Sequence, residues 1–211
     1  MIDDDGVKVR IQAEFNVSFD TMDRLSVHAA LLKKWNPAIN LVAKSTLNDL
    51  WTRHFLDSAQ VFGVARLLSG RWLDLGTGGG FPGMVVAILA AELAPKMTFT
   101  FIESDARKAV FLQNVSRETG VLVDVLTQRA EKAPPQAVDV VSARAMAPLR
   151  DLLPLAQRHL KPAGIGVFQK GATHRQEMKE ALETWRFQSD EYASTTDANA
   201  VILKFGDIRL V

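Results

Sequence analysis

A glycine-rich segment is the part of this chain whose residue types most clearly indicate a bound ligand. It reads Asp74-Leu-Gly-Thr-Gly-Gly-Gly-Phe-Pro-Gly83, so that Gly76, Gly78 and Gly80 alternate with other positions. Glycine allows sharp turns and lets a ligand approach without meeting a Cβ atom, but it loses much conformational entropy on folding. Four glycines within five positions are therefore better explained by a ligand than by a tight turn alone.

The register of this segment bears on which ligand it holds. The run from Gly78 to Gly83 is a literal G-x-G-x-x-G, which by itself is weak evidence for a dinucleotide site. A dinucleotide pyrophosphate would face free N–H groups at the start of the following helix. The preceding predicted strand ends at Leu75, so the dinucleotide register should begin at Gly76, and it fails at Phe81. Pro82 also removes a backbone donor there. Both features favour a ligand without a pyrophosphate.

A carboxylate at the end of the next predicted strand supplies a partner for the loop. Glu103 follows Phe99-Thr-Phe-Ile, twenty residues after Gly83. An acid in this position can accept hydrogen bonds from both ribose hydroxyls of an adenosine, a group that NAD and S-adenosylmethionine share. After the third predicted strand, Ala130 and Glu131 could meet an adenine edge. The pattern acid-Leu-Gly-x-Gly-x-Gly resembles motif I of the class I S-adenosylmethionine-dependent methyltransferases, and we expect that cofactor.

The elements that position these residues alternate between strands and helices. This alternation predicts an α/β fold with a doubly wound, mostly parallel sheet. The last two strands are separated only by a loop, which indicates an antiparallel C-terminal strand. We expect a Rossmann-like class I methyltransferase fold with seven strands, at 71–75, 97–103, 121–126, 137–142, 165–169, 185–191 and 200–205. The predicted helices between them cover 82–94, 106–119, 149–160 and 172–184.

The residues before this core carry a different pattern. Signals are weak before Phe19, and a helix with an apolar face then runs to Asn36-Pro37, where we expect it to end because the residue before proline avoids the α region. Two more helices are predicted at 46–56 and 57–68. We therefore interpret residues 1–70 as a helical cap and residues 71–211 as the cofactor-binding core.

Composition limits the classes of partner. Lys and Arg total 25 against 24 Asp and Glu, so nucleic acid would have to bind through local basic patches. Cysteine is absent, and the four histidines show no metal-ligand spacing, so we expect no metal. The longest apolar run, 84–94, is too short for a membrane span. We expect a cytoplasmic protein without a membrane partner, and a monomer because no exposed apolar helix stands out.

Several blocks together resemble one narrower family, the GidB/RsmG family of bacterial 16S ribosomal RNA guanine-N7 methyltransferases. The blocks occur in the family's order between about residues 31 and 171 and are jointly specific. They are Trp35-Asn-Pro-Ala-Ile-Asn-Leu41, Arg53-His-Phe-Leu-Asp-Ser58, the glycine-rich loop, Glu103-Ser-Asp-Ala-Arg-Lys108, Val141-Ser-Ala-Arg-Ala145 and Lys170-Gly171.

The resemblance implies cofactor contacts, a substrate and a place of action. The implied cofactor contacts are Gly76, Phe81, Ala130, Glu131 and Arg144, to which the loop and the wider class add Gly78, Gly80 and Glu103. The implied substrate is a guanine N7 in 16S ribosomal RNA, either free or in the small ribosomal subunit. One departure concerns Arg144, since the family often has S-R-A where this chain has Ser-Ala-Arg-Ala, which leaves the partner of Arg144 open.

The implied chemistry needs no general base. Guanine N7 attacks with a lone pair and has no proton to lose, so positioning and desolvation should dominate an in-line methyl transfer. No catalytic residue is assigned, and Arg144 is the candidate for orienting cofactor or guanine. For the RNA we expect contacts from Asn40, Arg53, His54 and Lys170, with Arg53 and His54 closing over the pocket beside Asn40.

Three alternatives stay open at the level of sequence. The core motifs alone fit a methyltransferase that acts on a protein or small molecule, and only the flanking blocks argue against it. A nicotinamide-dependent dehydrogenase would use the same fold and the same strand-end acid. A non-catalytic binding module that keeps the pocket is the third.

Overall fold

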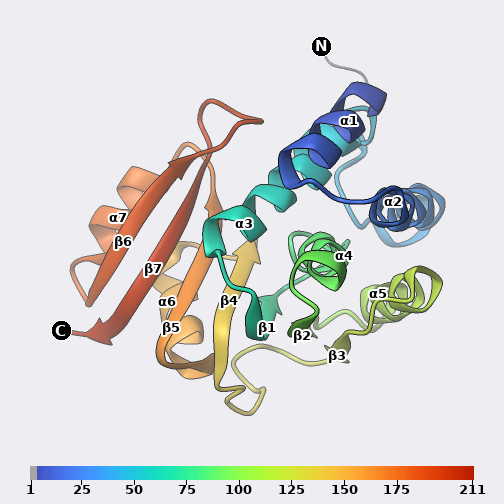
Figure 1. Cartoon of the computed structure of the whole chain (residues 1–211). Coiled ribbons are helices and arrows are strands. Elements are labelled where there is room, and N and C mark those ends of the chain that lie inside the picture. Colours follow the sequence, from blue (N-terminus) through green and yellow to red (C-terminus); the bar gives the residue numbers. More distant parts are fainter. Residues whose placement is uncertain (1–3) are drawn as a thin grey trace.

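The computed structural model describes residues 4–211, which are built around a twisted seven-stranded sheet (Figure 1). The strands lie in the order β3-β2-β1-β4-β5-β7-β6. Strands β1 to β5 run parallel to one another, whereas β7 is antiparallel to both of its neighbours, β5 and β6. In chain order the strands are β1 (Ser69–Leu75), β2 (Lys96–Ile102), β3 (Asp124–Leu126), β4 (Val138–Arg144), β5 (Leu160–Lys170), β6 (Trp185–Ala193) and β7 (Val201–Leu210). The predicted mostly parallel sheet with an antiparallel C-terminal strand is confirmed.

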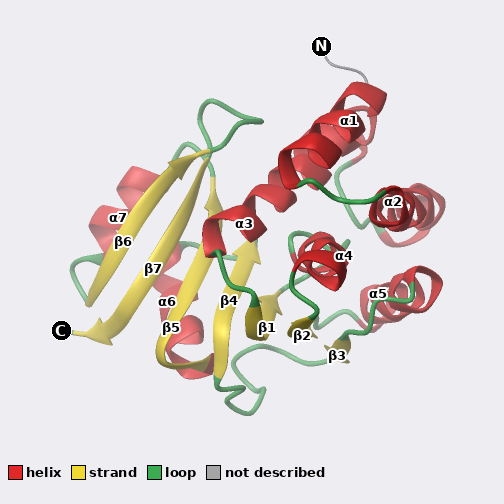
Figure 2. Ribbon diagram, viewed as in Figure 1, coloured by secondary structure: helices red, strands yellow, loops and turns green. Residues whose placement is uncertain are grey.

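Both faces of the sheet are apolar, which forces helices onto each. Successive side chains in a strand point to opposite faces, and Trp72 and Leu73 on β1 are both buried, each in a different core. Helices α4 (Gly83–Leu93) and α5 (Ala106–Thr119) cover the first face. Helices α6 (Leu149–His159) and α7 (His174–Ala181) cover the second (Figure 2).

The order of the strands decides where a ligand can bind. It reverses between β1 and β4, and in open α/β sheets ligands bind beyond the carboxyl ends of strands at such a switch point. The register there pairs Asp74 with Ser142 and Leu75 with Ala143. The glycine-rich loop after β1, Glu103 after β2 and Arg144 at the end of β4 are thereby brought to one edge of the sheet.

The N-terminal part packs against the first face and reaches this same edge. It consists of α1 (Asp4–Phe15), α2 (Phe19–Ile39), the 3₁₀ helix η1 (Lys44–Asp49), the π-helical segment η2 (Trp51–Leu56) and α3 (Asp57–Ala65). Helix α2 lies beside α4 and α5, and α3 packs against α4 and β5 (Figure 1). Side chains of α1, α2 and α3 join the core formed by α4 and α5.

No helix is predicted before Phe19, where the sequence signals are weak, but the described residues contain one. Helix α1 occupies Asp4–Phe15, with Val7 and Ile11 buried; residues 1–3 of that stretch lie outside the described part. Two apolar residues one turn apart are too sparse a pattern to predict a helix from sequence. The segment instead owes its place to tertiary contacts, since Val7 and Ile11 belong to the core cluster.

Other helix and strand boundaries also differ from those predicted. Helix α2 continues through Pro37 and ends only at Asn40, which adopts a left-handed conformation with φ of 51°. The side chain of the buried Asn36 accepts a hydrogen bond from the Val42 N–H six residues further on, and α2 packs against α4 and α5. Together these contacts outweigh the local effect of the proline. The predicted helix 46–56 divides into η1 and η2, and β5 begins at Leu160 rather than Ile165.

Replacing Ile11 by alanine tests whether α1 belongs to the fold. Ile11 is fully buried, so the truncation should lower the free energy of unfolding by about 2–5 kcal/mol, the usual range for such core changes. Urea denaturation measures this quantity. The matched control is Val9→Ala on the same helix, at a position 65% exposed, which should change stability by less than about 0.5 kcal/mol. Equal effects at the two positions would contradict the packing of α1.

Candidate functional site

The glycine-rich loop is shaped by close contacts on its inner side. Gly80 has a φ of +95°, and a Cβ atom there would lie 2.8 Å from the ring of His28. A Cβ atom on Gly83 would lie 2.7 Å from the carboxylate of Asp74. At both positions any larger residue would have to displace a buried neighbour, so these glycines are required by packing within the loop.

Asp74 is the anchor beneath the loop. Its side chain is fully buried and accepts hydrogen bonds from the Ser142 hydroxyl at 2.5 Å and the Gly83 N–H at 3.2 Å. The Trp72 indole N–H donates in turn to Ser142 at 2.7 Å. Burial raises the pKa of Asp74 to about 7, although the hydrogen bonds from Ser142 and Gly83 act in the opposite direction. Asp74 therefore fixes the start of α4 relative to β1 and β4.

Glu103 lies at the end of β2, as the sequence predicted, and is held against the loop. Its two carboxylate oxygens accept the N–H groups of Gly78 and Asp105, each at 2.8 Å. The residue is only 7% exposed. A strand-end acid that is fixed beside a glycine loop matches the requirement for holding ribose hydroxyls.

The start of α4 has few free donors for a pyrophosphate. Pro82, which precedes the helix, has no N–H. The Gly83 N–H donates to Asp74, and the Met84 N–H donates to the Gly80 carbonyl at 3.0 Å. Because the helix N-terminus is satisfied internally, it does not offer the N–H groups that a dinucleotide uses. The structure thus supports the ligand class that the sequence register favours.

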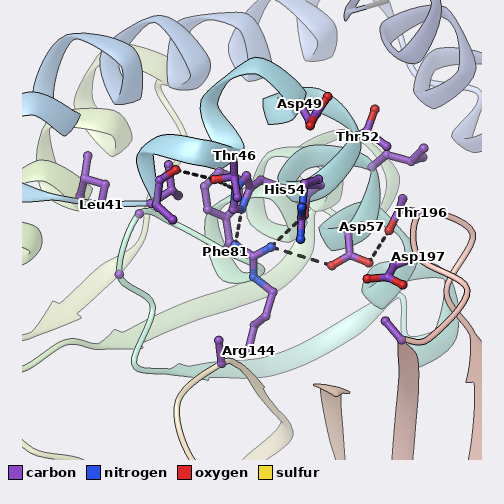
Figure 3. Close-up of a pocket in the computed structure, with 18 of the residues that line it drawn as sticks. Leu41, Thr46, Asp49, Thr52, His54, Asp57, Phe81, Arg144, Thr196 and Asp197 are labelled. Carbon is purple, nitrogen blue, oxygen red and sulfur yellow. Dashed lines mark hydrogen bonds and ion pairs between the residues drawn. The ribbon is translucent and has the colours of Figure 1, made fainter. Parts of the chain in front are cut away.

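Two cavities meet at Gly76 on the carboxyl side of the sheet. The larger has a volume of about 840 Å³ and is bounded by residues of the cap, the loop, β4 and the β6–β7 loop, among them Leu41, Arg53, His54, Asp57, Gly76, Gly78, Phe81, Arg144, Thr196 and Asp197 (Figure 3). The smaller, of about 510 Å³, is lined by Gly76, Glu131 and Ala130 among others. An elongated ligand could therefore cross Gly76 with one end in each cavity.

Arg144 lies at the centre of the larger cavity's wall (Figure 3). One terminal nitrogen, Nη1, donates to the Arg53 carbonyl at 3.0 Å, and the other, Nη2, lies 2.7 Å from His54 Nδ1. The guanidinium lies over the Phe81 ring, 4.9 Å from its centroid. Burial lowers the pKa of Arg144 to about 10, while the negative charge of Asp57 acts against that shift. The partner of Arg144 that the sequence left open is thus the Arg53–Ser58 block of the cap.

Asp57 joins three walls of this cavity. Its carboxylate lies 3.8 Å from Arg144 Nη1 and accepts hydrogen bonds from the hydroxyls of Ser194 at 3.1 Å and Thr196 at 3.0 Å. The Gln169 amide donates to the same carboxylate and, at 3.1 Å, to the Asp57 carbonyl. Burial raises the pKa of Asp57, opposed by Arg144 and the two hydroxyls. Asp57 therefore attaches the β6–β7 loop to the cap, a role that sequence reasoning missed.

His28 of α2 supports the loop from the cap side and was also missed. Its Nε2 lies 2.8 Å from the Gly79 carbonyl, and its ring stacks on Phe81 with centroids 5.2 Å apart. Burial lowers the pKa of His28 to about 4, although the hydrogen bond to Gly79 acts the other way. The ring is therefore neutral near pH 7 and donates its Nε2 proton to the carbonyl. Its sole signal in the sequence was a histidine on the apolar face of a predicted helix.

The remaining predicted site residues do not all line the larger cavity. Ala130 and Glu131 line the smaller cavity, and Gly80 lies behind the loop against His28. Within residues 4–211 the lining of the larger cavity includes neither Asn40 nor Lys170. Lys170 is 9% exposed and bonds Glu177 at 2.6 Å and the Ala147 carbonyl at 2.9 Å. Among the lining residues that the site prediction did not name are Val7 and Arg10 of α1 and Lys108 of α5.

Among residues 4–211 the structure shows no group of three or more His, Asp or Glu side chains placed to hold a metal ion. Over the same residues, none of the helices combines the length and the apolar character needed to cross a bilayer.

The fold and the site define the class of protein. A glycine-rich loop at the switch point, an acid after β2 and a seven-stranded sheet with an antiparallel β7 are features of class I S-adenosylmethionine-dependent methyltransferases. Solved structures agree at the level of fold. An S-adenosylmethionine-dependent methyltransferase from Aquifex aeolicus aligns with a TM-score of 0.59 at 16% identity, covering 84% of this chain and 97% of its own. Aeropyrum pernix fibrillarin bound to S-adenosylmethionine aligns at 0.56 and 18%, covering 73% and 75%.

Sequence comparison gives the family. A model described as rRNA small subunit methyltransferase G matches residues 21–203, and the chain belongs to that family. The ribosomal RNA small subunit methyltransferase G of Ruegeria sp. (strain TM1040) is 51% identical over 198 residues, 94% of this chain and 96% of the relative. That of Rhodospirillum centenum (strain ATCC 51521 / SW) is 50% identical over 197 residues, 93% and 89%. The resemblance read from the sequence blocks is confirmed, and with it the predicted class of enzyme, an S-adenosylmethionine-dependent rRNA methyltransferase.

The burial of His28 makes a prediction about pH. The folded-state pKa of about 4 lies below that of an unfolded histidine, so the unfolded state takes up a proton first as pH falls. His28 should therefore lower the free energy of unfolding by about 2 kcal/mol between about pH 7.5 and about pH 5. His28→Gln, which keeps an amide donor near Nε2, should lose that much less stability over the same interval in chemical denaturation.

Comparing how the free energy of unfolding changes with pH in the wild type and in His28→Gln isolates the contribution of His28. Asp74, whose pKa is raised, contributes a slope of opposite sign, but it does so in both proteins. His54 and His159, whose pKa values are also lowered, are likewise common to both. Identical changes in stability with pH for the wild type and His28→Gln would show that His28 is not held neutral in the folded protein.

Proposed function

We propose that this protein transfers a methyl group from S-adenosylmethionine to N7 of a guanine in 16S ribosomal RNA. The observation that carries the proposal is the pair of cavities that meet at Gly76, with Glu103 beside the loop and Arg144 in the wall of the larger one. Membership of the rRNA small subunit methyltransferase G family supplies the class of substrate. The guanine N7 target follows from the family resemblance.

The residues of the loop and its neighbours fit the cofactor. Glu103 would accept the ribose hydroxyls, with Gly78 beside it and Gly80 shaping the turn. The smaller cavity, lined by Ala130 and Glu131, would take the adenine. Gly76, Phe81 and Arg144 lie on the larger cavity and would bound the sulfonium end, where the cofactor supplies an electrophilic methyl group.

The protein's part in the reaction is orientation and exclusion of water. The N7 lone pair forms the new N–C bond while the S–C bond breaks, so no proton has to be removed. Phe81 and Arg144 form a wall that is largely withdrawn from solvent, which suits a transfer that depends on aligned, desolvated partners. We propose that Arg144 orients the reactants and that no general base takes part.

Ribosomal RNA would approach from the cap side of the larger cavity. Arg10, Arg53 and Lys108 come from three different elements and all line this cavity, where they form a rim of cationic groups among the acidic Asp49 and Asp197, in a chain of net charge +1. Such a rim can hold phosphates without a generally basic surface. We propose that residues 1–70 act as the substrate-side cap on a core of residues 71–211. Asn40, His54 and Lys170 remain predicted RNA contacts.

The site of action and the assembly state are further proposals. A protein that methylates ribosomal RNA works where ribosomes are assembled, and we therefore propose a cytoplasmic enzyme. A monomeric state stays a prediction.

Nucleoside mass spectrometry of 16S ribosomal RNA tests the proposed reaction. RNA from cells that lack the protein should lose a 7-methylguanosine that returns when the wild-type gene is restored. Arg144→Ala should restore it poorly, because the reactants lose the group that orients them. An unchanged content of 7-methylguanosine would refute the proposal. Labelled methyl transfer to small subunits, free RNA and bulk protein would then distinguish the protein or small-molecule alternative.

Replacing Glu103 tests the cofactor assignment independently of RNA. Glu103→Gln removes a charged acceptor, so S-adenosylhomocysteine should bind about 10- to 100-fold more weakly in calorimetry. Glu118→Gln, an exposed glutamate on α5, is the control and should bind like the wild type. NAD should not bind to any of the three proteins. Tight NAD binding without S-adenosylhomocysteine binding would instead establish the dehydrogenase alternative.

A further inference from the structure

A chain of hydrogen bonds runs from Arg144 through His54 to η1 (Figure 3). Arg144 Nη2 lies 2.7 Å from His54 Nδ1, and His54 Nε2 lies 2.8 Å from Thr46 Oγ1. The Thr46 hydroxyl donates to the Ala43 carbonyl at 2.7 Å. These contacts connect β4, η2 and η1. All the groups in the chain belong to side chains except the last acceptor, which is the backbone carbonyl of Ala43.

Chemistry fixes the direction of every bond in this chain. A guanidinium can only donate, so His54 Nδ1 must be the unprotonated acceptor. The single proton of the neutral ring is then on Nε2 and donates to Thr46. Thr46 can accept that proton because its own hydroxyl proton is directed to Ala43. The Thr46 hydroxyl therefore stabilises the tautomer of His54 that can receive Arg144.

His54 is built into the wall of the cavity. It is 8% exposed, and its ring lies 5.0 Å from the Phe81 ring between centroids. Burial, followed by the positive charges of Arg144 and Arg53, lowers the pKa of His54 to about 3. Both ring nitrogens have partners within the protein, so the ring has little left with which to bond a base. The neutral ring is what Arg144 requires.

Arg144 has an alternative partner that makes this support necessary. Asp57 Oδ2 lies 3.8 Å from Nη1, beyond a hydrogen bond but close enough for strong attraction. Two of the five guanidinium N–H groups are occupied by His54 and the Arg53 carbonyl, which leaves three for a ligand. Without His54 the guanidinium could turn toward Asp57, on another part of the cavity wall, and pair with that carboxylate instead of keeping its N–H groups free for a ligand.

We propose that His54 is a positioning residue, which holds the Arg144 guanidinium across Phe81 with its remaining N–H groups directed to the cavity, and that Thr46 sets the tautomer it needs. The inference rests on the proposed function for what the cavity contains, but the hydrogen-bond chain itself is a property of this fold. It gives His54 a role that acts through Arg144, and this role replaces the direct RNA contact that the sequence predicted for His54, because both of its ring nitrogens already have partners in the protein.

Three substitutions separate this role from simple packing. His54→Leu fills the space without an acceptor, whereas His54→Asn places a carbonyl oxygen near the Nδ1 position. Thr46→Val removes the group that fixes the tautomer while leaving the ring in place. We expect kcat/KM for methylation of small subunits to fall about 10- to 100-fold in His54→Leu, with the cofactor affinity reduced in the same direction. His54→Asn should recover to within about 3-fold of wild type, and Thr46→Val should lie between them.

A double-mutant cycle with Arg144→Met gives the decisive readout. This change keeps a long unbranched side chain beside Phe81 and removes every donor. If His54 acts through Arg144, His54→Leu in the Arg144→Met background should reduce S-adenosylhomocysteine affinity by less than about 2-fold further. Full multiplication of the two effects would overturn the proposal, as would a His54→Asn protein that folds with the wild-type melting temperature yet is as impaired as His54→Leu.

The double-mutant cycle tests the role of His54 separately from the proposed methylation reaction. The control is His174→Asn, which changes a buried histidine that lines neither cavity and bonds the Gly171 carbonyl three residues before it. This change should leave cofactor affinity unchanged. If wild-type protein binds S-adenosylhomocysteine but methylates no ribosomal RNA, the proposed function fails, and the coupling between His54 and Arg144 is still measured by calorimetry. If the coupling is absent while methylation is present, the positioning role alone fails.

Discussion

A guanidinium withdrawn from water must be given partners, because an unpaired buried charge is strongly destabilising. The side chain of Arg144 is 17% exposed, and β4 alone cannot satisfy it. Its partners, the Arg53 carbonyl, His54 and Asp57, all come from the cap. Asp57 in turn requires donors and draws the hydroxyls of the β6–β7 loop to the same point. One charge at the end of β4 therefore determines how three separate parts of the chain meet around the larger cavity.

The same cap also holds the other half of the site. His28 of α2 bonds the Gly79 carbonyl and stacks on Phe81, so the glycine loop is supported from the cap side as well as by Asp74 beneath it. Phe81 contacts both systems, since Arg144 lies over its ring. The cavity wall that contains Arg144 and the glycine loop are thus connected through the Phe81 ring, which contacts both Arg144 and His28. The N-terminal helices are part of the site rather than an extension beside it.

Much of the core was predictable because its signals are local. The glycine loop, Glu103 and Arg144 each follow a buried apolar strand, and parallel strands bring their carboxyl ends together. The missed features depend on contacts between distant residues that leave no pattern in a single sequence. His28 is 51 residues from Gly79, and Asp57 is 137 residues from Ser194. The same holds for the packing of α1, for the boundaries of the cap helices and for the β6–β7 loop as a wall of the cavity. All three depend on contacts between residues far apart in the sequence. The proposed methylation of guanine N7 rests on the family resemblance, and neither local sequence patterns nor contacts in the fold indicate the base.

A crystal structure of the protein with S-adenosylhomocysteine would show directly how the two cavities divide the ligand. We expect the adenine beside Ala130 and Glu131, the ribose and sulfur crossing Gly76, and the homocysteine end in the larger cavity, next to an Arg144 still held by His54. A ligand confined to one cavity, or an Arg144 that has left His54 and turned away from the ligand, would contradict this expectation.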